Sequence, residues 1–237
     1  MRPEKAAVLP YGLTAREYPD FVRRWDRVYC GSSFCPGLAP SKEAVSALYR
    51  AGARAVTVLT PFVTDEALAK LVKLFGGMAR AGLRPEIAVS DLGLLSALRS
   101  GPWRRGSFTL GRPLSHDFLR MPVTFLKKFF AENGIAMLET DEADMAEGLP
   151  ARGLKVAFHY PLRFVTMSRC CPWTGRMGSC SRPVCAGRRK VLTAPGMTAP
   201  GGKKPGRLIL SENAYFFGGG RPPAHPAVAR TVFAPGA

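Results

Sequence analysis

Six cysteines are the residues of this chain best suited to chemistry. Two lie near the N-terminus, at Cys30 and Cys35, and the other four fall within sixteen residues of one another. Those four are Cys170, Cys171, Cys180 and Cys185. Four thiolates can hold either a zinc ion or an iron–sulfur cluster. Zinc ribbons usually present two C-x2-C pairs, and this chain has none, so the spacing favours an iron–sulfur cluster.

Arginines are concentrated around the second set of cysteines. They are Arg169, Arg176, Arg182, Arg188 and Arg189. Nearby positive charge lowers the pKa of a thiol and offsets the negative charge of a cluster. The alternative is that the six thiols are ordinary core residues, since free cysteine is among the most buried residue types. The Arg-, Gly- and Pro-rich surroundings favour ligands over core.

The first residues, MRPEKAAVLPYGLTAREYPD, lack the apolar run and cleavage site of a secretory signal. No apolar stretch approaches the roughly 20 residues that span a bilayer. The sequence therefore predicts a cytoplasmic protein with no membrane span. In a reducing compartment, cysteines serve as metal ligands or catalytic thiols more often than as disulfides.

Short apolar, β-branched segments alternate with helical segments along most of the chain, which predicts parallel strands joined by helices. The expected strands are Val8–Tyr11, Arg27–Tyr29, Ala55–Leu59, Glu86–Val89, Ser107–Leu110, Ile135–Leu138, Leu154–Tyr160 and Thr231–Phe233. Eight such units predict a (β/α)8 barrel of the TIM type, with an open doubly wound sheet as the alternative. Little chain follows the eighth strand, so we expect an incomplete barrel without its last helix.

The helical segments carry start and stop signals. Ser41 is an expected N-cap and Gly52 the stop of the same helix. The other expected helices are Tyr18–Trp25, Asp65–Gly82, Leu94–Leu98, Val123–Phe130 and a short acidic helix before the seventh strand. We expect one domain over residues 1–237, with a cysteine-rich loop after strand seven and a Gly/Pro-rich insert near residues 195–206. Residues Leu208–Phe217 are expected to form a strand or hairpin.

The predicted barrel would bring the two sets of cysteines together. In both candidate folds, ligands bind beyond the carboxyl ends of the strands. Cys30 and Cys35 follow the second expected strand, and the other four cysteines follow the seventh. The two sets would therefore share one rim.

Composition and charge narrow the classes of protein. The chain has 237 residues, 46% of them hydrophobic, which excludes a coiled coil, a collagen-like chain and a wholly disordered protein. Residues 1–150 hold 20 Lys/Arg against 16 Asp/Glu, a net of +4, whereas residues 151–237 hold 14 against Glu212 alone, a net of +13. The cationic last third would attract phosphates or another polyanion. The alternative is that it reflects background residue usage.

Three motifs give the chain a family resemblance. They are YCGSSFC at Tyr29–Cys35, VSDLGLL at Val89–Leu95, and FHYPLRFVTMSRC at Phe158–Cys170, with two further cysteines downstream. In order and spacing these motifs resemble the collagenase-like peptidase superfamily over most of the chain. The nearest branch is that of the UbiU/UbiV-type iron–sulfur proteins of oxygen-independent ubiquinone biosynthesis.

The resemblance implies a cofactor, site residues and partners. It implies a four-iron four-sulfur cluster, written 4Fe-4S, with four ligands: Cys35, Cys170, Cys180 and Cys185. Whether Cys30 or Cys171 replaces one of these four ligands is left open. It also implies that His159 and Asp91 line a catalytic site, the alternative being that each makes a structural hydrogen bond. A homologous partner subunit in a heterodimer and a quinone precursor or other aromatic substrate are the implied partners.

Four functions remain open from the sequence. The first is an iron–sulfur protein that supports hydroxylation of a quinone precursor without molecular oxygen. The second is a collagenase-like peptidase, although the chain has no H-E-x-x-H and no G-x-S-x-G motif. The third is RNA base hydroxylation, with RNA held by the basic last third and its aromatic residues Trp173, Tyr215, Phe216 and Phe217. The fourth is a binding or scaffold role with a purely structural cluster.

Overall fold

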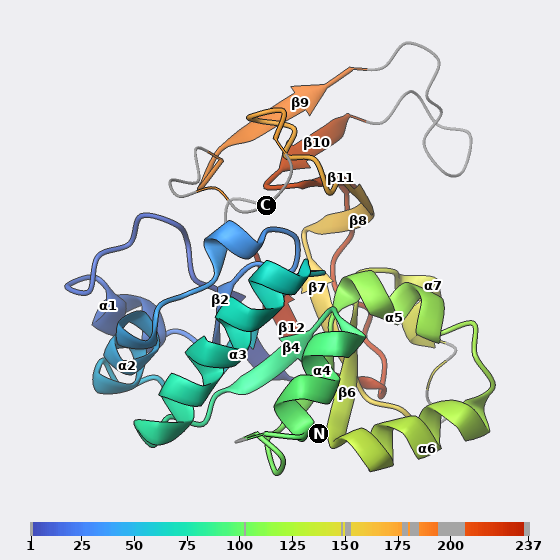
Figure 1. Cartoon of the computed structure of the whole chain (residues 1–237). Helices are drawn as coiled ribbons and strands as arrows, with labels where there is room; N and C mark the ends of the chain where they lie inside the picture. Colours follow the sequence, from blue (N-terminus) through green and yellow to red (C-terminus); the bar gives the residue numbers. More distant parts are fainter. Residues whose placement is uncertain are drawn as a thin grey trace.

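Eight parallel strands close into a barrel in the part of the chain that the structure describes (Figure 1). The structure is a computed structural model. It describes residues 2–101, 103–147, 149, 153–176, 180, 185–193 and 207–234. The (β/α)8 barrel predicted from the sequence is therefore confirmed, and the open sheet is excluded. The Gly/Pro-rich insert predicted at residues 195–206 lies outside the described residues.

The barrel strands run in the order β1-β12-β7-β6-β5-β4-β3-β2, and β1 closes the ring by pairing with both β12 and β2. Their bounds are β1 Glu4–Val8, β2 Arg27–Gly31, β3 Val56–Leu59, β4 Glu86–Val89, β5 Phe108–Leu110, β6 Ile135–Thr140, β7 Val156–Tyr160 and β12 Val228–Phe233. The prediction of the first strand at Val8–Tyr11 is wrong. The strand starts at Glu4 because its pairing partners, Arg27 and Arg230, are set by the neighbouring strands.

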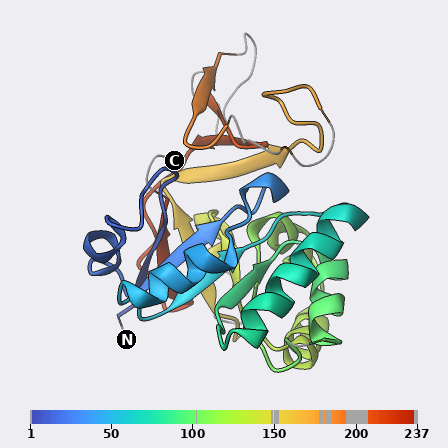
Figure 2. The same cartoon turned by 60° about the vertical axis from the view of Figure 1, so that its left-hand side comes forward.

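Helices cover the outside of the strands (Figures 1 and 2). Their bounds are α1 Tyr18–Val22, α2 Lys42–Arg50, α3 Asp65–Arg80, α4 Leu92–Arg99, α5 Arg112–Phe118, α6 Val123–Asn133 and α7 Ala143–Glu147. The predicted Ser41 cap is confirmed, since its side chain accepts the Ala44 N–H. Helix α5 was not expected. Among the described residues, none of the helices is long and apolar enough to cross a membrane.

A second sheet covers one end of the barrel (Figure 2). Four antiparallel strands form it in the order β8-β11-β10-β9, and we call it the cap sheet. Their bounds are β8 Leu162–Met167, β9 Arg189–Leu192, β10 Leu208–Ser211 and β11 Ala214–Gly218. The predicted hairpin within Leu208–Phe217 is confirmed as β10 and β11. Strands β8 and β9 were not expected, so the described part of the cysteine-rich segment lies between β8 and β9 rather than directly after β7.

Aromatic side chains fasten the cap sheet to the barrel. Phe34, in the loop after β2, stacks on Phe164 of β8 with ring centroids 5.1 Å apart. It meets Phe216 of β11 edge-on at 5.3 Å. The guanidinium of Arg112 lies 5.0 Å from the Phe34 ring centroid. The end of the barrel beneath this sheet is the carboxyl end of the strands, where barrel folds place their ligands.

The barrel interior has an apolar middle. Its buried side chains are Ala6, Tyr29, Leu59, Ala88, Ala157 and Val232. Three alanines leave room for the large Tyr29 ring and for the polar groups above and below. Toward the amino ends of the strands, Arg230 donates to Glu86 at 2.6 Å and to the Tyr29 hydroxyl at 2.7 Å. Toward the carboxyl ends lie Glu139 of β6 and His159 of β7, both almost fully buried.

Candidate functional site

The two cysteines of the YCGSSFC motif have different surroundings. Cys30 is on β2 and packs in the apolar layer between the strands and the helices. Burial raises the pKa of its thiol to about 12. Cys35 lies five residues further, beyond the end of β2, where it packs against Leu38 and Cys185. The structure therefore places Cys30 in the core and Cys35 at the rim.

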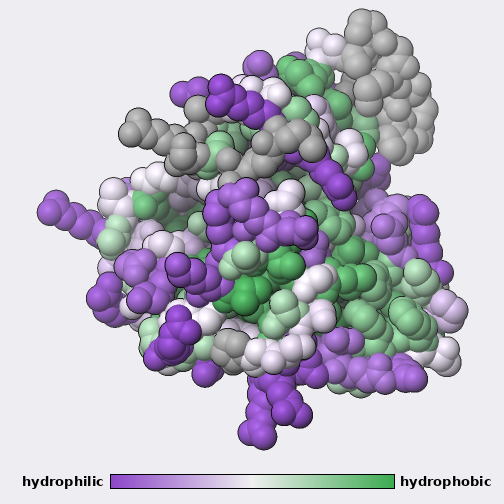
Figure 3. Space-filling model, in the orientation of Figure 1, coloured by the Kyte–Doolittle hydropathy of each residue, from purple (hydrophilic) through white to green (hydrophobic). Residues whose placement is uncertain are grey.

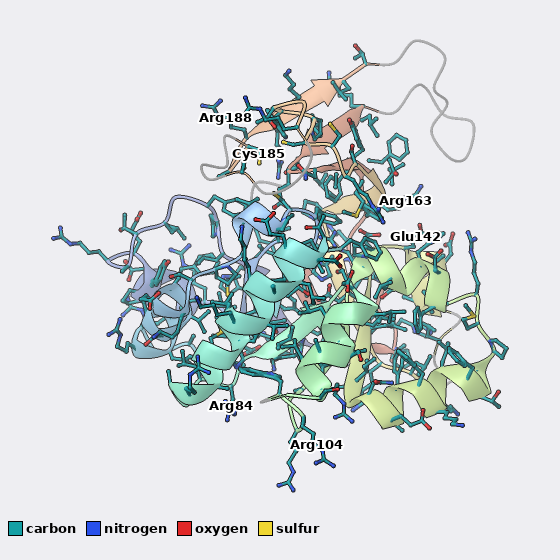
Figure 4. The ribbon with its side chains drawn as sticks, in the orientation of Figure 1. Arg84, Arg104, Glu142, Arg163, Cys185 and Arg188 are labelled. Carbon is teal, nitrogen blue, oxygen red and sulfur yellow. The ribbon has the colours of Figure 1, made fainter. Side chains whose placement is uncertain are left out.

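The rim brings together thiols that are far apart in the sequence. Cys35 and Cys185 belong to one packed cluster, which Tyr11 and Trp173 flank. Cys180 lies alongside, because a Cβ added at Gly37 would come within 3.4 Å of the Cys180 Sγ. Figure 4 shows Cys185 on the barrel side of the cap sheet. Three of the four ligands that the resemblance implies are thus neighbours.

Cys171 is joined to these three thiols by its effect on the pKa of Cys185. Burial, then the charges of Cys171, Glu212 and Cys180, raises the pKa of the Cys185 thiol. Burial, then the charges of Cys185, Glu212 and Cys180, raises that of Cys35 to about 12, against a hydrogen bond from the Gly37 N–H. We call Cys35, Cys171, Cys180 and Cys185 the cysteine group. Cys170 is half-buried, and its carbonyl accepts a hydrogen bond from Ser168 at 2.7 Å.

Cys171 also has the local geometry of a thiolate ligand. It opens a tight turn in which the Gly175 N–H donates to the Cys171 carbonyl at 2.8 Å. Burial alone would raise the pKa of its thiol, but hydrogen bonds from the Thr174 hydroxyl and from the Trp173 and Thr174 N–H groups lower it below its usual value. N–H groups that point at a cysteine sulfur stabilise the thiolate and tune a bound iron–sulfur centre.

The donor set fits an iron–sulfur cluster. Thiolates gathered at one place repel one another, and a bound cationic centre removes that repulsion by holding all of them deprotonated. No set of three or more His, Cys, Asp or Glu side chains within the described ranges is arranged to hold a single metal ion.

Glu212 connects the cap sheet to the cysteine group. It lies in the turn between β10 and β11 with φ at +55°, a left-handed conformation that is uncommon outside glycine. Its carboxylate accepts hydrogen bonds from the Tyr11 hydroxyl at 2.8 Å and from the Ser32 hydroxyl. Its carbonyl accepts the Trp173 indole N–H at 2.6 Å. The only acidic residue of the last third thus positions loops on both sides of the cysteines.

His159 faces the barrel axis from β7. Its ring meets the Tyr29 ring edge-on at 5.6 Å, and its Nε2 lies 3.3 Å from Oε1 of Glu139. Burial first, and then the charge of Arg112, lower the pKa of His159, so the imidazole is neutral at pH 7. The sequence prediction did not include Glu139. It directly follows the expected strand Ile135–Leu138. A position just after a barrel strand is where site residues are expected, and this feature of the sequence could have identified Glu139.

Asp91 caps helix α4. It is the N-cap of α4, where Oδ1 accepts the Leu94 N–H at 2.8 Å. Its Oδ2 accepts the Val63 N–H at 3.4 Å. Both oxygens are therefore used to fix the loops after β3 and β4. These are structural hydrogen bonds of the kind given above as the alternative for Asp91.

A cavity of about 330 Å³ opens beside Glu139 at the carboxyl end of the barrel, and we call it the mouth cavity. Among its lining residues are Phe62, Arg112, Glu139, Asp141, Glu142 and Phe164. Arg112 forms a buried ion pair with Asp141 at 3.1 Å. Phe164 stacks on Phe34, the residue before Cys35, so one aromatic contact separates the mouth cavity from the cysteine group.

Comparison with known proteins assigns no family to this chain. No protein-family model matches this chain. A search of curated proteins also finds no match. The structure shows a TIM-type barrel that carries three neighbouring thiols, those of Cys35, Cys180 and Cys185, on its rim and a cavity in its mouth.

Proposed function

We propose that this chain is an iron–sulfur protein, related to the collagenase-like peptidase superfamily, that supports oxygen-independent hydroxylation of an aromatic quinone precursor. One observation carries the proposal. Cys35 comes from the first strands and Cys185 from a segment 150 residues later, yet the two side chains pack together. A structural metal site gathers thiolates from separate parts of a chain, and these thiols are not bonded as a disulfide.

The ligands would be Cys35, Cys180, Cys185 and one of the adjacent pair Cys170 and Cys171. The resemblance implies Cys170, whereas the hydrogen bonds to the sulfur favour Cys171. A bound 4Fe-4S cluster would supply electron transfer at the rim of the barrel. The chain's own contribution is to bring an aromatic substrate close to that rim. Phe164, which lines the mouth cavity and stacks on Phe34 beside the cysteine group, would exclude water and pack against the ring.

Removal of Cys35 tests the cluster. We expect wild type purified without oxygen to be brown and to contain iron and acid-labile sulfide in equal amounts. The Cys35→Ala variant should lose most of both, because one iron would be left without a protein ligand. Cys30→Ala is the matched control, since it removes a thiol of the same motif that packs in the core. It should keep the wild-type iron content.

The same measurement decides the fourth ligand. If Cys171 is the ligand, Cys171→Ala loses iron and Cys170→Ala keeps it; the reverse result restores the ligand that the resemblance implies. The proposal is rejected if iron content is equal in wild type, Cys35→Ala and Cys30→Ala. A single zinc ion bound in place of iron would reject it equally.

RNA base hydroxylation is the second candidate, favoured by the charge of the cap sheet. The described cationic residues around this sheet are Arg163, Arg169, Arg176, Arg188, Arg189, Lys190, Arg207 and Arg221. Figure 3 shows hydrophilic side chains on this part of the surface, with hydrophobic ones between them. The one acid, Glu212, is turned inward. Of the predicted stacking residues, Phe216 is buried and Trp173 is bonded to Glu212.

RNA binding through this surface would depend steeply on salt. Phosphate contacts release counterions, so the affinity for a single-stranded RNA held by six such contacts should fall about 300-fold between 50 and 200 mM salt. Filter binding of a single-stranded RNA over this range measures the effect. An affinity that does not change with salt, or no binding at 50 mM, would leave only the first candidate.

A further inference from the structure

A second cavity adjoins the cysteine group, and we call it the side cavity. Its volume is about 500 Å³, within the usual range for ligand pockets. Its lining includes Phe34 and Pro36, which flank Cys35, and Arg169, which precedes Cys170. Helix α3 begins at this cavity, at the end of the barrel that the cap sheet covers (Figure 1). The side cavity therefore lies against the segments that carry the cysteines.

The side cavity and the mouth cavity are neighbours. Phe62 and Met167 line both of them. Phe34 lines the side cavity, Phe164 lines the mouth cavity, and these two rings are stacked on each other. One stacked pair thus offers an aromatic ring to each cavity, and a ligand in either place lies close to Cys35.

The walls of the side cavity suit a flat apolar ring. Phe34, which is 4% exposed, and Phe62, which is half-buried, contribute aromatic rings. Pro36, Val63 and Met167 add apolar surface, and the Met167 thioether adapts to the shape of a ligand. Aromatic rings attract one another beyond the effect of the area that they bury. A ligand with one or two fused rings would therefore be held here.

Asn213 brings an amide oxygen without a partner to the side cavity. The residue is 5% exposed, and its Oδ1 accepts no hydrogen bond from the described residues. Buried amides are nearly always hydrogen-bonded, so an unpaired one in a cavity wall indicates a group that a ligand or a water completes. The turn is fixed, because the Asn213 carbonyl accepts the Ser168 N–H at 2.9 Å and the preceding Glu212 bonds to Tyr11 and Trp173.

The charges around the side cavity nearly cancel. Glu66 lines the cavity but forms an ion pair with Lys70 at 2.6 Å. The remaining charged lining residues are one acid, Asp65, and one base, Arg169, and both are exposed. The lining therefore favours a neutral ligand. An anionic ring is the competing ligand, because Arg169 and the N–H groups that begin α3 would attract it.

We propose that the side cavity binds a neutral phenol, with its ring against Phe34 and Phe62 and its hydroxyl hydrogen-bonded to the Asn213 amide. A hydroxyl both donates and accepts, so it can pair with either end of an amide. A site that hydrogen-bonds a hydroxyl rejects the ring that lacks one, because the buried amide is then left unpaired. Hydroxylation converts an aromatic ring into a phenol. That the side cavity receives the hydroxylated ring rests on the function proposed above, whereas the binding site does not.

Three probes with the same rings test the proposal by equilibrium dialysis against anaerobically purified protein. 2-Naphthol carries the hydroxyl, naphthalene lacks it, and 2-naphthoate carries an anionic group in its place. We expect 2-naphthol to bind about tenfold more tightly than naphthalene, the effect of one buried hydrogen bond that the hydroxyl alone satisfies, and 2-naphthoate to bind more weakly than 2-naphthol. This comparison is made on wild type, so it tests the proposal without any substitution.

Asn213→Leu separates this site from the mouth cavity, because Asn213 lines the side cavity and not the mouth cavity. Leucine has a similar size but no amide, so the affinity for 2-naphthol should fall about tenfold while that for naphthalene should not fall. Asn133→Leu is the matched control, since Asn133 ends α6 and donates to the Phe129 carbonyl of the same helix at 2.9 Å. It should leave both affinities unchanged. Arg169→Gln should also leave 2-naphthol binding unchanged, because that ligand is neutral.

Three outcomes overturn the inference. They are equal affinities of wild type for naphthalene and 2-naphthol, equal effects of Asn213→Leu and Asn133→Leu, or tightest binding of 2-naphthoate that is lost in Arg169→Gln. The last would assign the side cavity to anions.

Iron content, measured on the same samples, separates the binding site from the proposed function. It should be unchanged in Asn213→Leu, because the backbone bond to Ser168 remains. Protein without iron that still binds 2-naphthol through Asn213 would reject the proposed hydroxylation and keep the binding site. Protein with iron but without a preference for 2-naphthol would reject the binding site and keep the proposed function.

Discussion

Arg230→Met is expected to lower the free energy of unfolding by about 3 to 5 kcal/mol, the cost of removing one partner from a buried ion pair. The Arg230 guanidinium is 3% exposed and joins three strands that are distant in sequence, through Glu4 of β1, Tyr29 of β2 and Glu86 of β4. Methionine fills similar space but leaves the Glu86 carboxylate, 7% exposed, with the Thr57 hydroxyl at 2.8 Å and Arg27 at 3.7 Å as its remaining partners among the described residues. Urea unfolding followed by circular dichroism measures the loss.

Arg54→Met is the matched control for this prediction. Arg54 also pairs with an acid, at 3.5 Å from Asp26, but its side chain is 80% exposed. Exposed pairs contribute about 0 to 1 kcal/mol, so this variant should unfold almost like wild type. Equal losses in the two variants would contradict a stabilising role for the buried network.

The loss in Arg230→Met should depend on pH. Burial alone would raise the pKa of Glu86, but Arg230 and Arg27 lower it below its usual value of 4.5. A carboxyl whose pKa is lowered on folding stabilises the fold above its unfolded pKa, and this contribution fades as the pH falls. In the variant, burial has the larger effect on the pKa of Glu86 and raises it. Protonation of Glu86 at low pH then removes the cost of burying its charge. The difference between wild type and variant should therefore shrink from pH 7 to pH 4.

Gly31→Ala is expected to destabilise the barrel by about 2 to 5 kcal/mol, the sum of left-handed strain and overpacking. Gly31 ends β2 with φ at +91°. A Cβ there would lie 2.8 Å from the Leu59 carbonyl oxygen of β3 and 2.9 Å from Cδ of Pro40. The backbone of β3 cannot yield without opening the barrel. Thermal unfolding and iron content are the two measurements.

Gly12→Ala separates strain from crowding, because Gly12 has the same φ of +91° but nothing within 4 Å of an added Cβ. Gly12→Ala should lower the free energy of unfolding only by the left-handed strain, about 1 to 2 kcal/mol, and should leave the iron content unchanged. Gly31→Ala should also lower the iron content, since displacement of β2 moves Ser32, whose hydroxyl accepts the Cys35 N–H at 2.9 Å. Equal stabilities of the two variants would show that the end of β2 has room to adjust.

Local sequence patterns were sufficient to predict most of the strands and helices of the barrel. Helix α3 begins at Asp65, as predicted, because Thr64 caps it and apolar residues recur at helical spacing. Strand β4 has the predicted bounds, since both of its faces are buried and its sequence reads as an uninterrupted strand. Strand β8 of the cap sheet is not evident in the sequence, because it follows β7 after a single residue and both strands lie within the motif at Phe158–Cys170.

The polar pairing inside the barrel could not be predicted in the same way. Glu4 and Arg230 are 226 residues apart, and they meet only because β12 closes the ring beside β1. Glu139 and His159 face each other because β6 and β7 are adjacent and both residues point inward at the carboxyl end. Local periodicity gives the direction of a side chain from its own strand, but the partner depends on which strands become neighbours.

The sequence by itself determined a ring of alternating strands and helices, and it placed Cys35 and the later cysteines beyond strand ends on one rim. Tertiary structure alone decided that Cys35 packs on Cys185, that Cys171 turns its sulfur toward N–H donors, and that Cys30 lies in the core. The physical reason is the distance along the chain over which each kind of interaction acts. Periodicity and capping act within a few residues, whereas these contacts arise from chain closure and from a cap sheet that folds back over the barrel.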